Sequence, residues 1–322
     1  MHLKIYLIGS FMGVKVTEAT TVRELVETIL ARYQVPIEYA KMCTIVAKKG
    51  TEYGITLQHS ELIQNYQNCI LYFRIIQFFG KELIEQLNPM YIQMAQLQMH
   101  KLVTSSLWLT DQNTACSLAA YQCAIEFGSY NGQQFGFVNN TISTLLSAEF
   151  IDKKKQIQQD VINKWKEYSE QGLVETKHKA ILNYLHTAAE WVPQFGTYVI
   201  NCYLLNQDYQ VIGTECFLSV AKDKCIVTSL TNQVLAYSDW SDTDLQISPR
   251  DSKRFTLKIN NKNFEFQCEN IVKFQPIIEW QKTQSYNDLI SIDSTQQNDE
   301  QLISPTTCIE SEQICVEQIE EV

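Results

Sequence analysis

The side chains best suited to chemistry in this sequence are lysines, most of them close together in one segment. They are Lys153, Lys154, Lys155, Lys164 and Lys166, with Lys222 and Lys224 further along the chain. Such a cluster attracts an anionic membrane surface with about 1 kcal/mol per basic residue. The run therefore predicts a lipid-binding site. The competing interpretation is a solvated helix face, since Asp152, Asp160 and Glu167 lie nearby.

The cysteines and histidines do not form a recognisable catalytic or metal-binding motif. The ten cysteines contain no Cys-x-x-Cys pair, whereas zinc ligands usually come in close pairs and disulfide scaffolds are short secreted chains. We expect most of them to be small buried hydrophobic residues. The five histidines make no pair on one helical turn, and no glycine-rich phosphate-binding loop is present. The sequence thus predicts no metal, no cofactor and no enzyme, and leaves open a Cys-His pair assembled only by the fold.

The charge is concentrated at one end of the chain. The net charge is −10, but residues 283–322 carry nine acidic and no basic side chains, so the rest is close to neutral. A globally basic nucleic-acid binder is therefore not expected. The polar composition predicts that this acidic tail is disordered when alone. It either covers the lysine run as a tethered competitor or only keeps the protein in solution.

Targeting signals are not recognisable in the sequence. The N-terminus lacks the apolar run of a secretory signal, and no apolar stretch reaches the ~18 residues that a membrane span needs. Together with the cysteine usage, this predicts a cytoplasmic protein.

The first ~79 residues have the pattern of a small mixed sheet. Alternation predicts a strand at His2–Leu7, a turn at Gly9-Ser10 and a second strand at Gly13–Val16. Thr21 and Glu24 are spaced for a capping box at the start of a helix. The helix then carries an apolar stripe. Its members are Val22, Leu25, Val26, Ile29 and Leu30. Two further strands are expected at 44–47 and 70–75, which completes a ubiquitin-like pattern.

From Gly80 to Trp191 the period is mostly helical. We expect an apolar stripe of Met90, Met94 and Leu97 in a helix over 90–103. A second helix is expected from Thr114 to Phe127, capped by Asp111 and ended by Gly128. The segment 149–168 is a long polar helical candidate. The segment 176–191 is another, with one apolar face. That face consists of Ile181, Tyr184, Leu185, Ala188 and Trp191.

From Phe195 the period changes to two. Seven short strands are expected, and their ranges are 197–205, 211–220, 224–230, 234–238, 244–248, 255–259 and 263–268. A helix over 269–280 would follow, with Pro276 kinking it or ending it early. Seven strands and a C-terminal helix are the arrangement of pleckstrin-homology and phosphotyrosine-binding modules.

The chain is expected to be ubiquitin-like, then helical, then pleckstrin-like. This is the order of the lobes in a FERM domain, and individual segments also resemble that family. Cys116–Asn131 (CSLAAYQCAIEFGSYN) closely resembles the central helix of the second FERM lobe. Ala180–Gly196 resembles the last helix of that lobe. Trp240-Ser241 followed by Phe255-Thr256-Leu257 resembles strands of the third lobe. Glu149–Lys155 (EFIDKKK) resembles the talin segment that follows the same helix. The resemblance covers about residues 1–282 and is of talin type, without the rod.

The resemblance implies an α+β, multi-lobe fold. Residues 1–79 would be a ubiquitin-like lobe, and 80–194 an all-helical, acyl-CoA-binding-protein-like lobe. Residues 195–282 would be a pleckstrin-homology/PTB-like β-sandwich with a C-terminal helix, and 283–322 an acidic disordered tail. In talin-like proteins a basic patch at the position of the lysine run faces the membrane.

The resemblance also implies a peptide groove in the third lobe, between the strand 244–248 and the helix 269–280. A peptide would add a strand to the exposed edge there. The candidate lining residues are Leu245, Gln246, Ile247, Ser248, Ile271, Phe274 and Ile278. For the three helix residues the competing interpretation is that they only cover the sheet, as their spacing of three and four allows. Ile247 and Ser248 stand where a talin-type groove has an Arg-Trp pair.

The function that the resemblance implies is a non-enzymatic adaptor. It would bind an anionic phosphoinositide membrane and the cytoplasmic tail peptide of a membrane protein at the cell cortex, and recruit a cytoskeletal protein indirectly. The alternative is a scaffold subunit of a larger cytoskeletal or ciliary assembly with no direct role for lipid. No nucleic-acid partner is expected.

Overall fold

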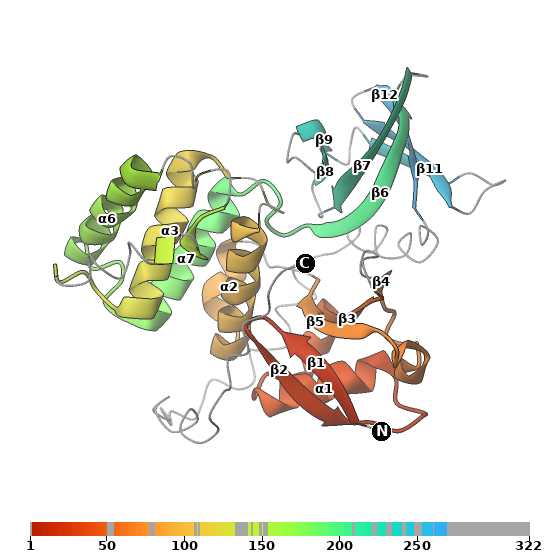
Figure 1. The fold of residues 1–322 in the computed structure, drawn as a ribbon, viewed down its shortest axis with the longest axis horizontal. Helices are drawn as coiled ribbons and strands as arrows, with labels where there is room; N and C mark the ends of the chain where they lie inside the picture. The colour runs from red at the N-terminus through yellow and green to blue at the C-terminus, as the bar shows by residue number, and fades with distance from the viewer. Residues whose placement is uncertain are drawn as a thin grey trace. The chain divides into compact units, whose positions relative to one another are not determined.

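In the computed structural model, Met1–Gln284 form one unit of the chain. The structure describes residues 2–49, 55–76, 81–105, 108, 110–132, 141–142, 144–147, 150, 154–207, 210–220, 224–229, 234–239, 243–247, 253–259 and 261–268. Within the described part, two sheets are separated in sequence by a helical segment (Figure 1).

The first sheet has five strands in the order β2-β1-β5-β3-β4. They are β1 (His2–Leu7), β2 (Ser10–Lys15), β3 (Cys43–Lys48), β4 (Ile55–Thr56) and β5 (Ile70–Ile75). Helix α1 (Val22–Arg32) packs on one face of this sheet (Figure 1), and the short helices η1 (Ile37–Met42) and η2 (Ile63–Tyr66) complete the segment. The central strand β5 runs parallel to β1 and antiparallel to β3.

The β1–β2 hairpin is tighter than the sequence predicts. Strand β2 begins at Ser10, three residues before the predicted start at Gly13, because the turn consists of Ile8 and Gly9. Gly9 has a φ of +76°, a value that glycine adopts without steric cost. The register therefore pairs Tyr6 with Phe11 across the two strands.

The start of α1 confirms the predicted capping box. The Thr21 hydroxyl accepts from the Glu24 N–H at 3.2 Å, and the Glu24 carboxylate accepts from the Thr21 N–H at 2.8 Å. Two N–H groups that would otherwise lack a partner are thereby satisfied. All five residues of the predicted apolar stripe are buried on this helix.

The helical segment contains η3 (Lys81–Gln86), α2 (Pro89–Thr104), α3 (Gln112–Phe127), α6 (Lys154–Glu170) and α7 (Lys177–Trp191). Helix α3 packs against both α6 and α7 (Figure 1). It is capped by Asp111 as predicted, since this carboxylate accepts from the Thr114 N–H at 2.9 Å. It ends at Gly128, whose φ is +79° and whose carbonyl accepts from the Trp165 indole of α6 at 3.0 Å.

The predicted stripe of α2 is wrong. Met90, Met94 and Leu97 are only half-buried. The buried residues of this helix are Tyr91, Ile92, Ala95, Gln96, Gln98, Met99 and Val103. Two of these are glutamines, which periodicity counts as polar, so the true core face was hidden in the sequence.

Both glutamines have hydrogen-bond partners. Gln96 donates to Gln122 of α3 at 2.7 Å. Gln98 accepts from the Ile75 N–H at 2.9 Å and donates to the Ile75 carbonyl at 2.6 Å. The Gln98 amide thus takes the place of a neighbouring strand at the end of β5, which satisfies both polar groups of a buried residue.

Helices α6 and α7 differ in detail from the sequence prediction. Helix α6 begins at Lys154 and continues to Glu170, and it buries Trp165 completely. On α7 the predicted face is confirmed for Ile181, Tyr184, Leu185 and Ala188, but Trp191 is 59% exposed. Trp191 is the last residue of the helix, so no following helical turn continues the apolar face beyond it.

The second sheet has seven antiparallel strands in the order β10-β11-β12-β6-β7-β8-β9. The strands are β6 (Tyr198–Gln207), β7 (Gln210–Val220), β8 (Lys224–Ser229), β9 (Val234–Asp239), β10 (Thr243–Ile247), β11 (Arg254–Ile259) and β12 (Lys262–Gln267). All seven were predicted from the two-residue period. Their inner side chains form one core that includes Phe255, Leu257 and Phe266. The helix predicted over 269–280 lies outside the described residues.

Replacing Gln98 with alanine should destabilise the protein by about 2–4 kcal/mol, because the buried N–H and C=O of Ile75 both lose their partner. Gln93→Ala is the matched control, since Gln93 is a half-buried glutamine of the same helix. Urea unfolding followed by circular dichroism measures both. Equal losses in the two variants would contradict the role assigned to Gln98.

The stability of the protein should fall as the pH drops from about 6.5 towards 4, in part through His100. Burial lowers the pKa of His100 to about 4, against the raising effect of its hydrogen bond with the Thr144 carbonyl. An unfolded histidine gains its proton near pH 6.5, so the unfolded state is favoured below that pH. His100→Gln should reduce the loss between pH 7 and pH 4.5 in urea unfolding, whereas His178→Gln, at an exposed site, should not.

Candidate binding surfaces

The lysines of the predicted lipid site do not all share one surface. Lys164 and Lys166 lie on α6, where Lys164 is half-buried and Lys166 is exposed. Two residues along an α-helix are about 200° apart around the axis, so these lysines flank the buried face of α6 on opposite sides. Lys166 also lies 3.8 Å from Glu170. A continuous basic surface with the lysine run can therefore include only one of them.

The remaining lysines of the set are described only in part. Lys154 and Lys155 open α6, and Lys153 lies outside the described residues. Lys222 also lies outside them. Lys224 begins β8, is half-buried, and is paired in register with Asp239 of β9.

Strand β10 forms one edge of the seven-stranded sheet. It pairs antiparallel with β11, and no other described strand pairs with it. The register places Leu245 opposite Leu257 and Ile247 opposite Phe255, two completely buried residues. An edge strand offers a row of backbone N–H and C=O groups to an added strand.

The groove residues predicted from the sequence divide into two groups. Leu245, Gln246 and Ile247 lie on β10, as predicted. The other four, Ser248, Ile271, Phe274 and Ile278, lie outside the described residues. The structure therefore describes the edge strand, and the opposite wall of the groove remains a prediction from the sequence.

The cysteines of the helical segment are unsuited to nucleophilic chemistry at neutral pH. Burial, together with the Asp160 carboxylate, raises the pKa of the Cys116 thiol to about 11. Burial raises that of Cys123 to about 12. A thiol is reactive and binds metal as the thiolate, so these two groups remain in the inert form. Among the described residues, no three His, Cys, Asp or Glu side chains gather as a metal site requires.

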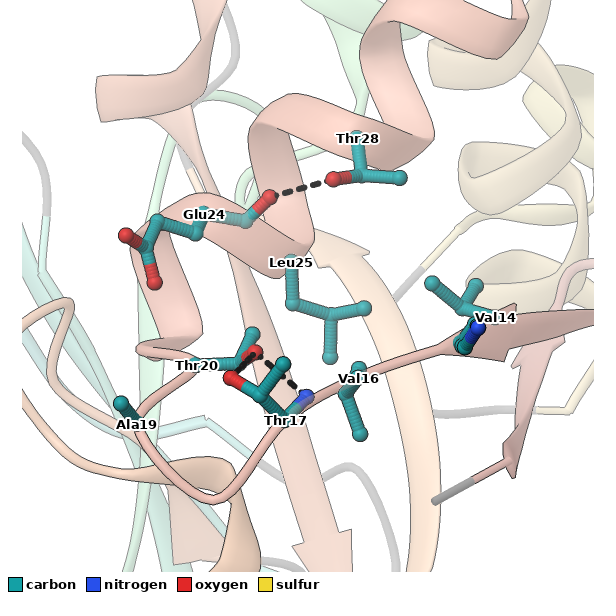
Figure 2. A pocket seen from close by; sticks show the side chains of 9 residues that line it. Val14, Val16, Thr17, Ala19, Thr20, Glu24, Leu25 and Thr28 are labelled. Carbon is teal, nitrogen blue, oxygen red and sulfur yellow. Dashed lines mark hydrogen bonds between the residues drawn. The ribbon is translucent and has the colours of Figure 1, made fainter.

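A pocket of about 350 Å³ lies between the end of β2 and the start of α1 (Figure 2). Its polar lining groups bond to one another. Thr20 accepts from the Thr17 N–H at 2.9 Å, and the Thr28 hydroxyl donates to the Glu24 carbonyl at 2.7 Å. Glu24 itself serves the capping box. These hydrogen bonds stabilise the β2–α1 connection, and the polar groups do not converge on a ligand.

One surface was missed in the sequence. On the side of the five-stranded sheet opposite α1, three aromatic rings lie beside two cations. We call this surface the aromatic-cationic face, and it consists of Lys4, Tyr6, Phe11, Tyr72 and Arg74. The strand register was the signal that could have found it, because these residues become neighbours only when β2, β1 and β5 are aligned.

Residues 82–199 match the family model of the FERM central domain. Solved structures of FERM domains superpose on most of the chain. The segment 82–199 thus matches the central domain of FERM proteins, and the chain has the FERM fold. The sequence prediction of this family is therefore confirmed, on the segment where its resemblance was most specific.

The similar structures come from several organisms. A myosin VII MyTH4-FERM MF2 domain from Dictyostelium discoideum matches with a TM-score of 0.68 at 13% identity, over 88% of this chain and 58% of that one. The complex of the FERM and C-terminal domains of Drosophila Merlin matches at 0.64 and 14%, over 88% and 94%. The human myosin 7b C-terminal MyTH4-FERM domain, in complex with the harmonin-a PDZ3 domain, matches at 0.60 and 12%, over 87% and 59%.

These identities are low enough that the similarity establishes the FERM fold and nothing finer. The chain spans somewhat over half the length of the myosin VII MF2 structure. No curated protein matches the sequence. Among the described helices, none combines the length and the apolar character that crossing a bilayer requires.

Proposed function

We propose that the chain is a non-enzymatic FERM adaptor that binds a peptide at the edge of β10 and an anionic phosphoinositide membrane through its lysine run. In this role it would link the cytoplasmic face of the membrane, directly or through a receptor's cytoplasmic tail, to the cortical cytoskeleton. The cytoskeletal protein would be recruited indirectly.

The observation that carries the proposal is the edge position of β10 in a chain with the FERM fold. Its backbone has one described strand partner, β11, and its other side is available for strand addition in the described part of the chain. Strand addition obtains affinity from main-chain hydrogen bonds and selectivity from neighbouring side-chain pockets. The Merlin and myosin 7b structures support the proposal, since each holds its FERM domain in a complex with another protein domain.

The proposal assigns the parts of the chain as the sequence predicted them. Residues 1–79 are the ubiquitin-like lobe, 80–194 the acyl-CoA-binding-protein-like helical lobe, 195–282 the PH/PTB-like lobe and 283–322 an acidic tail. The five-stranded sheet with α1, the four helices α2, α3, α6 and α7, and the seven-stranded sheet support this division. The talin-type character, and with it the membrane role of the lysine run, rests on the segment Glu149–Lys155.

A second candidate is a scaffold subunit of a larger cytoskeletal or ciliary assembly that does not bind lipid. Lys164 and Lys166 lie on opposite flanks of α6, and this favours the scaffold. Fewer lysines can then contact one membrane surface at the same time. Vesicle binding separates the two candidates.

A peptide bound at the β10 edge should protect the backbone amides of residues 243–247 from hydrogen exchange. Ten-residue peptides selected from a random display library against the full chain are the probe, and exchange is measured by mass spectrometry. Strand β9, the opposite edge of the same sheet, is the internal control and should be unchanged. Protection at 234–239 in place of 243–247 would refute the site.

Changing Lys153, Lys154 and Lys155 together to glutamine should weaken binding to phosphatidylcholine vesicles containing phosphatidylinositol 4,5-bisphosphate by about 100-fold in 0.1 M salt. The expectation follows from about 1 kcal/mol for each basic residue near an anionic surface. Vesicle co-sedimentation of the full chain measures it, and the binding of the parent should decline steeply as salt increases.

The matched control carries the same change at Lys101, Lys177 and Lys258, three exposed lysines from other elements. Equal losses in both triple variants would show that only net charge matters. A parent chain that ignores these vesicles but sediments with the cytoskeleton at high salt would favour the scaffold.

A further inference from the structure

We propose that the aromatic-cationic face of the five-stranded sheet is a second docking surface, and that its occupant is an acidic peptide segment of a partner protein. It differs from the β10 edge in position and in the chemistry that it recognises, so it does not depend on the peptide site proposed above.

The centre of the face is a row of side chains that crosses four strands. The register pairs Phe11 with Tyr6, Tyr6 with Tyr72, and Tyr72 with Val46. The Tyr6 ring centroid lies 6.3 Å from that of Phe11 and 5.6 Å from that of Tyr72. Phe11 is 59% exposed, and the two tyrosines are half-buried. The row is thus a continuous apolar strip at the surface of the sheet.

Cations lie on both sides of this row. The Lys4 ammonium lies 3.9 Å from the centroid of Phe11 and 4.9 Å from that of Tyr6. At the other side, the Arg74 guanidinium lies 5.1 Å from the centroid of Tyr72 and donates to the Phe73 carbonyl at 3.2 Å. These cation–π contacts hold both charges beside the rings, where they can reach a ligand lying on the row.

The face has no counter-charge of its own. The five strands contain four basic residues, Lys4, Lys15, Lys48 and Arg74, and no aspartate or glutamate. Among the described residues, no carboxylate forms an ion pair with Lys4 or Arg74. The charge is therefore complementary to an acidic ligand and repels a second copy of the same face.

The geometry favours a peptide over a membrane. Three strand spacings of about 4.8 Å make the row about 14 Å wide, which is the length of about four extended residues. Lys4 and Arg74 lie against the rings, so they do not extend towards a plane of lipid phosphates, and Phe11 is the single ring of the row that is mostly exposed. An extended segment with alternating acidic and aliphatic residues can cover the row and place carboxylates on both cations.

The test is fluorescence anisotropy of the full chain with a labelled synthetic peptide of twelve residues in which glutamate alternates with leucine. The parent should bind this peptide in a salt-dependent manner and should not bind the version with glutamine in place of glutamate. Phe11→Ala and Lys4→Gln should each weaken binding at least fivefold, because each removes part of the strip or its charge.

Gly13→Glu is the sharpest variant. Gly13 pairs with Lys4, and a Cβ placed there would meet nothing within 4 Å, so the substitution should leave the fold intact. It adds a carboxylate to the face and should weaken binding at least tenfold. Lys258→Gln, which changes the net charge by the same amount on an exposed strand position of the other sheet, should stay within twofold of the parent. Circular dichroism confirms that each variant is folded.

The proposal is overturned if the glutamate peptide does not bind the parent, if the glutamine peptide binds equally well, or if Gly13→Glu binds like the parent. It is also overturned if these variants instead reduce binding to phosphatidylserine vesicles, which would make a membrane the occupant. Loss of a dimer in Phe11→Ala, measured by analytical ultracentrifugation, would identify a second copy of the chain and would likewise refute it.

Discussion

The bidentate bond between Gln98 and Ile75 is the constraint on which much of the described structure depends. β5 is the central strand of the first sheet, and its last residue is buried. A buried peptide group without a partner costs about as much as a lost hydrogen bond, so the end of this strand needs a hydrogen-bonding partner. Gln98 supplies that amide from α2 and ties the strand to the first long helix of the FERM central domain. Tyr39 reinforces the same junction, since its hydroxyl accepts from the Asn88 N–H at 2.9 Å and its ring lies 4.7 Å from that of Tyr91.

The two sheets differ in the part that they offer to a partner, and their proposed roles follow from this difference. In the seven-stranded sheet the available element is an edge, because β10 pairs with β11 alone among the described strands. Such an edge recognises a partner mainly through the backbone, with little regard to charge. In the five-stranded sheet the available element is a face, where rings and cations converge. That face selects a ligand by its charge and its apolar side chains, so the two surfaces would distinguish different partners.

The sequence predicted the elements better than it predicted the surfaces. The capping box at Thr21, the cap at Asp111 and the seven strands follow from local rules, and the structure agrees with them. The stripe on α2 was wrong, because a buried glutamine looks polar until its partner on another element is known. The aromatic-cationic face was invisible, since Phe11, Tyr6 and Tyr72 become neighbours only through the strand register. The lysines of α6 were grouped by their proximity in sequence, although Lys164 and Lys166 flank the helix on opposite sides.

The contrast between the two basic surfaces bears on how an acidic partner would be selected. A lysine on an exposed helix flank, such as Lys166 with Glu170 at 3.8 Å, is surrounded by water and screened by salt. It attracts any anion weakly and selects none. Arg74 is half-buried, and burial lowers the pKa of its guanidinium, against the raising effect of Tyr72. Arginine stays charged at physiological pH despite that shift. The free protein therefore already bears the free-energy cost of partly burying this charge without a carboxylate beside it. A ligand carboxylate that reaches Arg74 would relieve this cost, which favours a ligand whose shape fits the row over any other anion.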